Sequence, residues 1–205
     1  MSGPTVVLVR HGSTEWSRAG RHTGRTDLPL DSDGKRQARA LAGPLARVRL
    51  RAGVASRVLV SPLVRAVRTA ELSRLAPFEL DADLVEWDYG EYEGLTTAQI
   101  REQVPDWSVF THPCPGGETQ AEIAQRCDRV LARVCDEAAA GTGLAVLVSH
   151  GHLLRCLAVR WLGRPVADGA ALPLAVASVC VLGHENGSRT LQRWNVANPT
   201  EEPLP

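Results

Sequence analysis

Positive charge in this 205-residue sequence comes almost entirely from arginine, because Lys35 is the only lysine. Acidic and basic residues balance at 23 each, so the sequence lacks the basic excess of a dedicated nucleic-acid or polyanion binder. We therefore expect no nucleic-acid partner. The balance leaves room for a local basic pocket built from arginine side chains.

Long apolar segments are also missing. No stretch is long enough to span a bilayer, and the first residues lack the charged and apolar regions of a signal peptide. The cysteines are odd in number, contain no CxxC pair and mostly fall inside apolar helix or strand patterns: Cys114, Cys127, Cys135, Cys156 and Cys180. We expect reduced thiols in a cytoplasmic protein with no membrane partner, and neither a disulfide nor a metal–thiolate site.

Segments typical of strands alternate with segments of helical periodicity. We predict strands over residues 5–9, 57–62, 78–87 and 144–152. We predict helices over residues 33–48, 63–70, 118–140 and 153–162, followed by a hairpin of residues 175–182 and 190–194. The first helix should break or kink at Gly43-Pro44, and Ser61-Pro62 should supply the N-cap and first residue of the second. This order favours an α/β fold with a mainly parallel sheet, in three α/β/α layers.

One segment interrupts the alternation. Residues 88–117 are rich in turn formers, aromatic residues and proline, and we expect a short excursion over the rim of the sheet with one helix over residues 96–103. Residues 199–205 have the composition of a flexible tail. No internal repeat is present. We therefore expect a single domain over residues 1–198.

Charged side chains and imidazoles follow two of the predicted strands directly. The strings LVRHG and LVSHG place Arg10, His11 and His150 where strands end, and Arg65 lies at the start of the helix that follows a third strand. The carboxyl ends of parallel strands are where α/β sheets gather their ligands. Guanidinium groups bind two oxygens of a phosphate at once, and a helix N-terminus favours an anion. These residues predict an anion site that contains a nitrogen nucleophile.

Five sequence blocks together resemble the histidine phosphatase superfamily, which has the phosphoglycerate mutase-like fold. The blocks are RHGSTEWSRAGRHTGRTDLPLDSDGKRQA, SPLVRAVRTA, EWDYGEYEGLT, PGGET and VSHGHLLR, in the family's order. They span residues 6–157, and the first and third are most similar to actinobacterial acid phosphatases and sugar-phosphate phosphatases.

The resemblance implies a role for each matching position. His11 would be the nucleophile and form a phosphohistidine, Arg10, Arg65 and His150 would hold the phosphoryl oxygens, and Glu86 would be the proton donor. Glu91 and Glu93 compete with Glu86 for the last role. The resemblance also implies phosphate or substrate contacts for a second set of residues: Ser17, Thr23, Gly24, Tyr89 and Gly151. It implies no metal and no other cofactor.

Two histidines near these blocks have open roles. His22 lies within the first block, and His152 follows a motif position that varies among such enzymes. The His150-Gly151-His152 triplet also has the spacing of a metal-ligand pair, but no third ligand stands at a partnering spacing. The sequence does not decide between these alternatives.

The expected reaction is hydrolysis of a phosphomonoester. Phosphoglycerate mutases of the family carry a lysine after the YGxxxGL block and an arginine pair in the excursion, and this sequence has neither. A cofactor-dependent mutase and a non-catalytic phosphate-binding module remain the alternatives. The excursion has aromatic residues and few charges beyond Arg101, which favours a small sugar phosphate over a highly anionic substrate. The oligomeric state is open, with a homodimer among the options.

Overall fold

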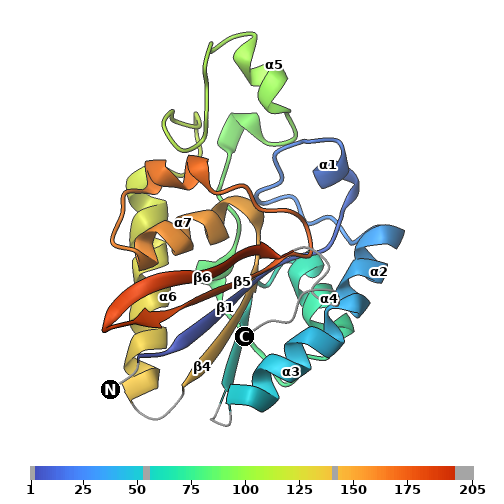
Figure 1. The fold of residues 1–205 in the computed structure, drawn as a ribbon. Coiled ribbons are helices and arrows are strands. Elements are labelled where there is room, and N and C mark those ends of the chain that lie inside the picture. Colours follow the sequence, from blue (N-terminus) through green and yellow to red (C-terminus); the bar gives the residue numbers. More distant parts are fainter. Residues whose placement is uncertain (1–2, 53–55, 140–142, 197–205) are drawn as a thin grey trace.

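The computed structural model describes residues 3–52, 56–139 and 143–196. Its centre is a six-stranded sheet with the order β3-β2-β4-β1-β5-β6 (Figure 1). The parallel strands are β1 (Thr5–Arg10), β2 (Ser56–Val60), β3 (Glu79–Leu80) and β4 (Leu144–Ser149). Strands β5 (Val179–Glu185) and β6 (Ser188–Val196) continue the sheet antiparallel. The expected α/β class with a mainly parallel sheet is confirmed.

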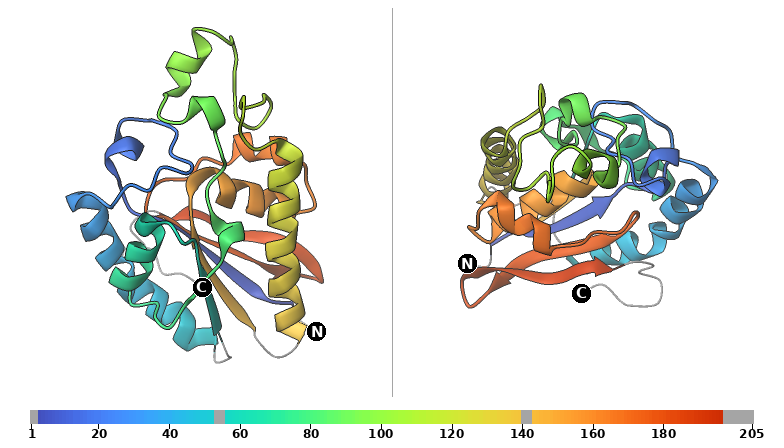
Figure 2. Two further views of the ribbon diagram at one scale, coloured as in Figure 1. Left: turned by 180° about the vertical axis from the view of Figure 1, so that it is seen from behind. Right: turned by 90° about the horizontal axis from the view of Figure 1, so that it is seen from above.

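Helices cover both faces of this sheet, as the two views of Figure 2 show. One layer holds α2 (Ser32–Ala40), α3 (Ala42–Ala52) and α4 (Val64–Leu72). The other holds α6 (Gln120–Ala139) and α7 (Gly151–Trp161). Alternate side chains of β1 divide between the layers: Val7 and Val9 pack in the cluster with α3 and α4, and Val6 and Leu8 in the cluster with α6 and α7. The expected three-layer arrangement is confirmed.

Burial on both faces explains the continuous apolar runs that predicted the central strands. The β1 side chains from Val6 to Val9 are fully buried, and all six residues of β4 are buried. Strands β1 and β4 pair in parallel register, with Arg10 opposite Ser149. This register brings Arg10-His11 and His150 to the same edge of the sheet.

Two predicted helix boundaries are wrong. The break between α2 and α3 falls at Leu41, two residues before Gly43-Pro44, and Pro44 lies in the first turn of α3, where its missing N–H removes no helical bond. Helix α4 begins at Val64 rather than at Ser61-Pro62. The Val64 N–H donates to Asp27 Oδ1 at 2.8 Å, so a carboxylate from a distant loop satisfies the start of α4.

Other boundaries move by a few residues. The strand predicted over residues 78–87 reduces to β3 and the short turn η1 (Ala82–Leu84). Helix α7 begins at Gly151, two residues before the prediction. In the hairpin, β5 begins and ends later than the predicted strand of residues 175–182, β6 extends beyond residues 190–194 at both ends, and the turn falls at Asn186-Gly187. Two further short elements are α1 (Glu15–Arg18) and η3 (Val166–Ala171). All five cysteines are free thiols, as expected.

The excursion of residues 88–117 stands over the carboxyl edge of the sheet, at the top of Figure 1. It contains η2 (Gly90–Tyr92) and α5 (Thr97–Arg101), so the helix expected over residues 96–103 is present but shorter. Thr96 caps α5 through a reciprocal pair of bonds with Gln99. The predicted tail of residues 199–205 lies outside the described residues, as does residue 140 of the predicted helix. Within the described chain no helix is both long and apolar enough to cross a bilayer.

Candidate active site

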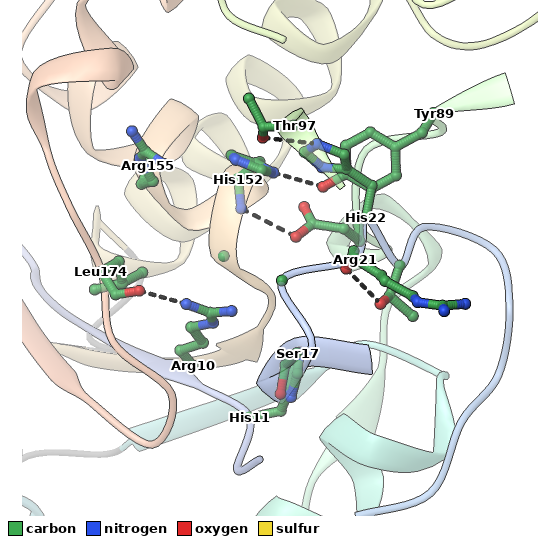
Figure 3. A pocket seen from close by; sticks show the side chains of 14 residues that line it. Arg10, His11, Ser17, Arg21, His22, Tyr89, Thr97, His152, Arg155 and Leu174 are labelled. Atoms are coloured by element: carbon green, nitrogen blue, oxygen red, sulfur yellow. Dashed lines mark hydrogen bonds between the residues drawn. The ribbon is translucent and has the colours of Figure 1, made fainter. Parts of the chain in front are cut away.

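A cavity opens at the carboxyl edge of the parallel strands, beneath the excursion (Figure 3). Its walls come from the loop after β1, from the start of α7 and from residues 86–97. His11, Arg10 and Glu86 line it, although they are far apart in sequence. The structure therefore brings together the residues that the strand ends and the third block predicted.

His11 lies directly after β1 and its side chain is buried. Its Nδ1 lies 2.7 Å from the carbonyl oxygen of Gly12. Because a carbonyl only accepts, Nδ1 carries the proton and Nε2 keeps a free lone pair. Burial, followed by the charges of Arg65 and Arg10, holds the pKa of His11 well below its usual range. His11 is thus a neutral imidazole with one unprotonated nitrogen at the cavity.

Arg65 and His150 form a buried pair behind His11. Neither lies on the cavity wall, and both side chains are fully buried. The Arg65 guanidinium donates to His150 Nδ1 at 3.1 Å and to the carbonyl oxygens of Thr23, Gly24 and Thr26 at 2.9–3.0 Å. These bonds fix a positive charge close behind the His11 ring, whose centroid is 5.1 Å from that of His150.

Arg10 provides a cation on the cavity wall itself. Its Nη1 donates to the carbonyl of Leu174, while its buried Nε finds no partner among the described residues. A Cβ atom at residue 151 would lie 3.1 Å from the Arg10 guanidinium carbon, so Gly151 leaves room for this side chain. A desolvated guanidinium N–H without an acceptor is what an anion site requires before its ligand arrives.

Glu86 is held by the N-terminus of α7. Its Oε1 accepts N–H groups from Leu153 at 2.8 Å and from Trp87 at 3.0 Å, and its Oε2 accepts the N–H of His152 at 3.0 Å. Oε2 thus has one bond where Oε1 has two, so Oε2 keeps the larger free hydrogen-bonding capacity. Of the three candidate acids, only Glu86 lines this cavity.

The second set of predicted residues divides into two groups. Ser17, Thr23, Tyr89 and Gly151 line the cavity. Gly24 does not, because its N–H donates to both oxygens of the Glu93 carboxylate at 2.9 Å and its carbonyl accepts from Arg65. Gly24 therefore positions Arg65. Glu93 also accepts the Thr26 N–H at 3.1 Å, so this carboxylate fixes the whole loop that holds Arg65.

His22 and His152, whose roles were open, both line the cavity (Figure 3). The Tyr89 hydroxyl lies 2.5 Å from His152 Nδ1, and His22 Nε2 lies 3.3 Å from the Thr97 hydroxyl. Burial lowers the pKa of His22 to about 4 and holds that of His152 well below its usual range. Both rings are neutral at pH 7, and they form a polar wall without charge.

His150 and His152 do not converge on a common point as a metal pair would. His150 is engaged by Arg65 and Ser61, and His152 by Tyr89. In the part of the chain that the structure describes, no group of three or more His, Cys, Asp or Glu is arranged to hold a metal ion.

Five cavity residues received no role from the sequence: Gly20, Arg21, Thr97, Arg155 and Leu174. Arg155 belongs to the fifth block, but its spacing does not distinguish it from a solvated helix arginine. Only the fold shows that it points into the cavity. Arg21 and Thr97 lie in segments joined by a β-bridge between Arg21 and Thr96, which the sequence does not signal.

Known proteins share this architecture. Residues 6–197 match the model of the histidine phosphatase superfamily (branch 1). The chain is 41% identical over 186 residues to an acid phosphatase of Mycobacterium tuberculosis, covering 91% of this chain and 89% of that protein. It is 34% identical over 185 residues to sedoheptulose 1,7-bisphosphatase of Saccharomyces cerevisiae, covering 78% and 68%.

Solved structures agree with these relatives. An open reading frame product of M. tuberculosis superposes with a TM-score of 0.89 at 38% identity, over 95% of this chain and 98% of that one. A mycobacterial glucosyl-3-phosphoglycerate phosphatase superposes with a TM-score of 0.80 at 27% identity, over 95% and 99%. The chain belongs to branch 1 of the histidine phosphatase superfamily and is a hydrolase of the phosphatase type.

Proposed function

We propose that this protein hydrolyses phosphomonoesters without a metal, through a phosphohistidine on His11. The observation that carries the proposal is the His11 ring, with Nδ1 bound to the Gly12 carbonyl and Nε2 unprotonated at the cavity beside Arg10. A neutral imidazole nitrogen is nucleophilic near pH 7, and it becomes an imidazolium-like leaving group once phosphorylated.

In the first step, His11 Nε2 attacks phosphorus and the bond from phosphorus to the ester oxygen breaks. The departing oxygen takes a proton from Glu86, so the alcohol leaves neutral and Glu86 becomes a carboxylate. The N–H groups of His152 and Leu153 keep the carboxyl group oriented throughout.

In the second step, water takes the place of the alcohol. Glu86 accepts a proton from this water while its oxygen attacks phosphorus, and the bond between phosphorus and Nε2 breaks. Inorganic phosphate leaves, and both His11 and Glu86 return to their starting protonation states. One carboxyl group serves as acid and then as base.

Positive charge replaces a metal in stabilising the transferred group. Phosphoryl transfer depends on positioning and on charge around the three equatorial oxygens. Arg10 lines the cavity, and its buried Nε–H has no partner among the described residues. Arg65, held in place by three backbone carbonyls, adds a fixed charge from behind His11. We assign Gly151, Ser17 and Thr23 to the remaining phosphate contacts.

The substrate we propose is a small phosphorylated metabolite, most simply a sugar phosphate, processed in the cytoplasm. The names of the similar proteins support this class, since two of them act on phosphorylated sugars or sugar derivatives. The neutral polar wall of His22, His152 and Tyr89 suits sugar hydroxyls, which both donate and accept hydrogen bonds. The five free thiols suit a reducing compartment.

Hydrolysis of a chromogenic aryl phosphate tests this proposal. We expect turnover by the wild type, none by His11→Ala, and unchanged turnover by His112→Ala, whose ring lies outside the cavity lining. Activity should survive a chelator and be inhibited by vanadate. An inert wild type would favour the binding-module alternative, and loss on chelation with rescue by zinc would reject metal independence. Phosphoglycerate interconversion that depends on bisphosphoglycerate would instead indicate a mutase.

A further inference from the structure

In the part of the chain that the structure describes, three arginines are buried or half-buried without a carboxylate partner. Among the described residues, the arginines that are not exposed form ion pairs with Asp or Glu, apart from Arg10, Arg65 and Arg155. Removing a guanidinium from water is costly unless an anion or several acceptors compensate it. Arg10 and Arg65 surround the proposed phosphoryl site. Arg155 shares their isolation but has no role in the chemistry described above.

The Arg155 side chain is held in one orientation. Its guanidinium carbon lies 4.3 Å from the centre of the Phe110 ring, and its Nε and Nη2 donate to the carbonyls of Gly169 and Ala170 at 2.9 and 3.1 Å. These bonds use two of its five N–H groups. The other three, both of those on Nη1 among them, have no acceptor in the described chain. Burial lowers the pKa of Arg155, yet a guanidinium stays charged at any physiological pH.

Arg155 stands well apart from His11 in the cavity. In Figure 3 Arg155 lies at the upper left and His11 at the bottom of the view. On α7, Arg155 follows Gly151 by four residues, so it lies one helical turn, about 5.4 Å along the axis, beyond the residue that contacts Arg10. Arg155 is therefore placed to meet a part of the substrate other than the transferred phosphoryl group.

A second cavity continues from the first at this point. His22, Thr97, His152 and Arg155 line both cavities, so the two are contiguous. The second cavity is walled by Trp107, Val109 and Phe110, with Arg101 also on its lining. The low dielectric beside these apolar side chains strengthens a charge interaction made next to them. A leaving group that extends from the phosphoryl site would enter this chamber beside the free N–H groups of Arg155.

We propose that Arg155 binds a second oxyanion, a phosphate or a carboxylate, carried by the leaving group of the substrate. This inference rests on the proposed function and narrows it, because it names a phosphomonoester whose leaving group carries a second anionic group rather than a sugar phosphate with an uncharged leaving group. It also revises the expectation drawn from the few charges of the excursion, since the cation comes from α7. The Nη1 and Nη2 end of the guanidinium offers the two parallel N–H groups that carboxylates and phosphates accept.

Pairs of ligands that differ by one anionic group distinguish binding of the second anionic group from binding of the phosphoryl group. In a His11→Ala background, which cannot be phosphorylated, calorimetry would compare fructose 1,6-bisphosphate with fructose 6-phosphate, and 3-phosphoglycerate with glycerol 3-phosphate. We expect Arg155→Ala to weaken binding of at least one ligand with two anionic groups about 10- to 100-fold while leaving its counterpart with one phosphate within about twofold. The pair that responds distinguishes a phosphate from a carboxylate. Equal weakening of both members of both pairs, or no weakening, would overturn the proposal.

The variants control for folding and for charge. Arg155→Met keeps a long apolar stem against Phe110, and Arg155→Lys keeps the charge without the fork, so Lys should bind the anionic ligand with intermediate affinity. Arg160→Ala removes another arginine of α7, one paired with Asp128, and should change neither affinity. Aryl phosphate turnover by Arg160→Ala should match that of the wild type. If the wild type hydrolyses the aryl phosphate but Arg155→Ala does not selectively weaken ligands with a second anionic group, the subsite is rejected and the phosphatase proposal stands. An inert wild type would instead reject the phosphatase proposal.

Discussion

Arg65 donates its Nε–H to Nδ1 of His150 across 3.1 Å, and this bond decides which nitrogen of His150 carries a proton. Since an arginine only donates, Nδ1 is the acceptor and Nε2 holds the hydrogen. Nε2 in turn lies 2.7 Å from the Ser61 hydroxyl, which therefore accepts. Desolvation, with the Arg65 charge next, holds the pKa of His150 well below its usual range. His150 is neutral, and its two ring nitrogens link Arg65 to Ser61, the residue that follows β2.

Ser61→Ala removes the hydroxyl that accepts the Nε2–H of His150. The His150 N–H would then be buried without a partner, which costs about 1–3 kcal/mol, and the ring could leave its place behind His11. We expect kcat/KM for an aryl phosphate to fall about 10-fold, which corresponds to about 1.4 kcal/mol and lies within the same range. Ser73→Ala is the matched control, because that buried hydroxyl donates only to helix carbonyls away from the site. Equal activity of the two variants would show that the hydrogen bond to Ser61 does not position His150.

Glu93→Ala should loosen the loop that holds Arg65. The carboxylate accepts the N–H groups of Gly24 and Thr26, and the carbonyls of the same two residues hold the guanidinium. Two buried or half-buried donors lose their acceptor, so we expect about 1–3 kcal/mol less stability in urea unfolding together with weaker vanadate inhibition. Glu91→Ala, two residues away and exposed, should change neither quantity. Stability loss with unchanged vanadate affinity would confine Glu93 to a purely structural role.

Glu86→Gln tests the proton donor through the leaving group. A nitrophenolate leaves readily without protonation, whereas an alkoxide from a sugar does not. We expect kcat for a sugar phosphate to fall at least about 100-fold and kcat/KM for a nitrophenyl ester to fall far less. Steady-state kinetics with both substrates on one preparation provides the comparison. A similar loss for both would show that Glu86 does not act as the acid.

Much of this architecture was predictable because it follows from local patterns. The apolar runs of β1 and β4 indicated buried parallel strands, and Arg10, His11 and His150 follow those strands directly. Contacts over long sequence distances were not predictable. The start of α4 depends on Asp27, the Gly24 N–H is taken by Glu93, and the orientation of Arg155 depends on Phe110 and on the carbonyls of η3.

Acid should destabilise the protein through its buried imidazoles. His11, His22, His150 and His152 all have pKa values lowered by burial, so below pH 6.5 the unfolded chain binds more protons than the folded one. The contribution of these histidines to the free energy of unfolding is therefore fully present above pH 6.5 and is lost as the pH falls below it. For His22, with a pKa of about 4, the loss between pH 7.5 and 5.5 is about 1.4 kcal/mol.

Urea unfolding of wild type and His22→Gln at these two pH values measures that contribution. His22 is surrounded by Tyr89, His152 and Trp107 and has no carboxylate among its ring contacts, so its substitution should remove mainly the proton linkage. The variant should lose about 1.4 kcal/mol less than the wild type between the two pH values. An identical pH dependence would mean that His22 titrates normally in the folded protein.

The most direct test of the account is a search for the phosphorylated enzyme. Rapid mixing with a nitrophenyl phosphate, an alkaline quench and intact mass analysis should reveal one added phosphoryl group that acid removes and that peptide mapping places on His11. The adduct should be absent from His11→Ala and should persist longer in Glu86→Gln, because the water that cleaves it loses its base. A wild-type enzyme that turns over while carrying no acid-labile phosphoryl group on His11, or a His11→Ala variant with full activity, would contradict the account.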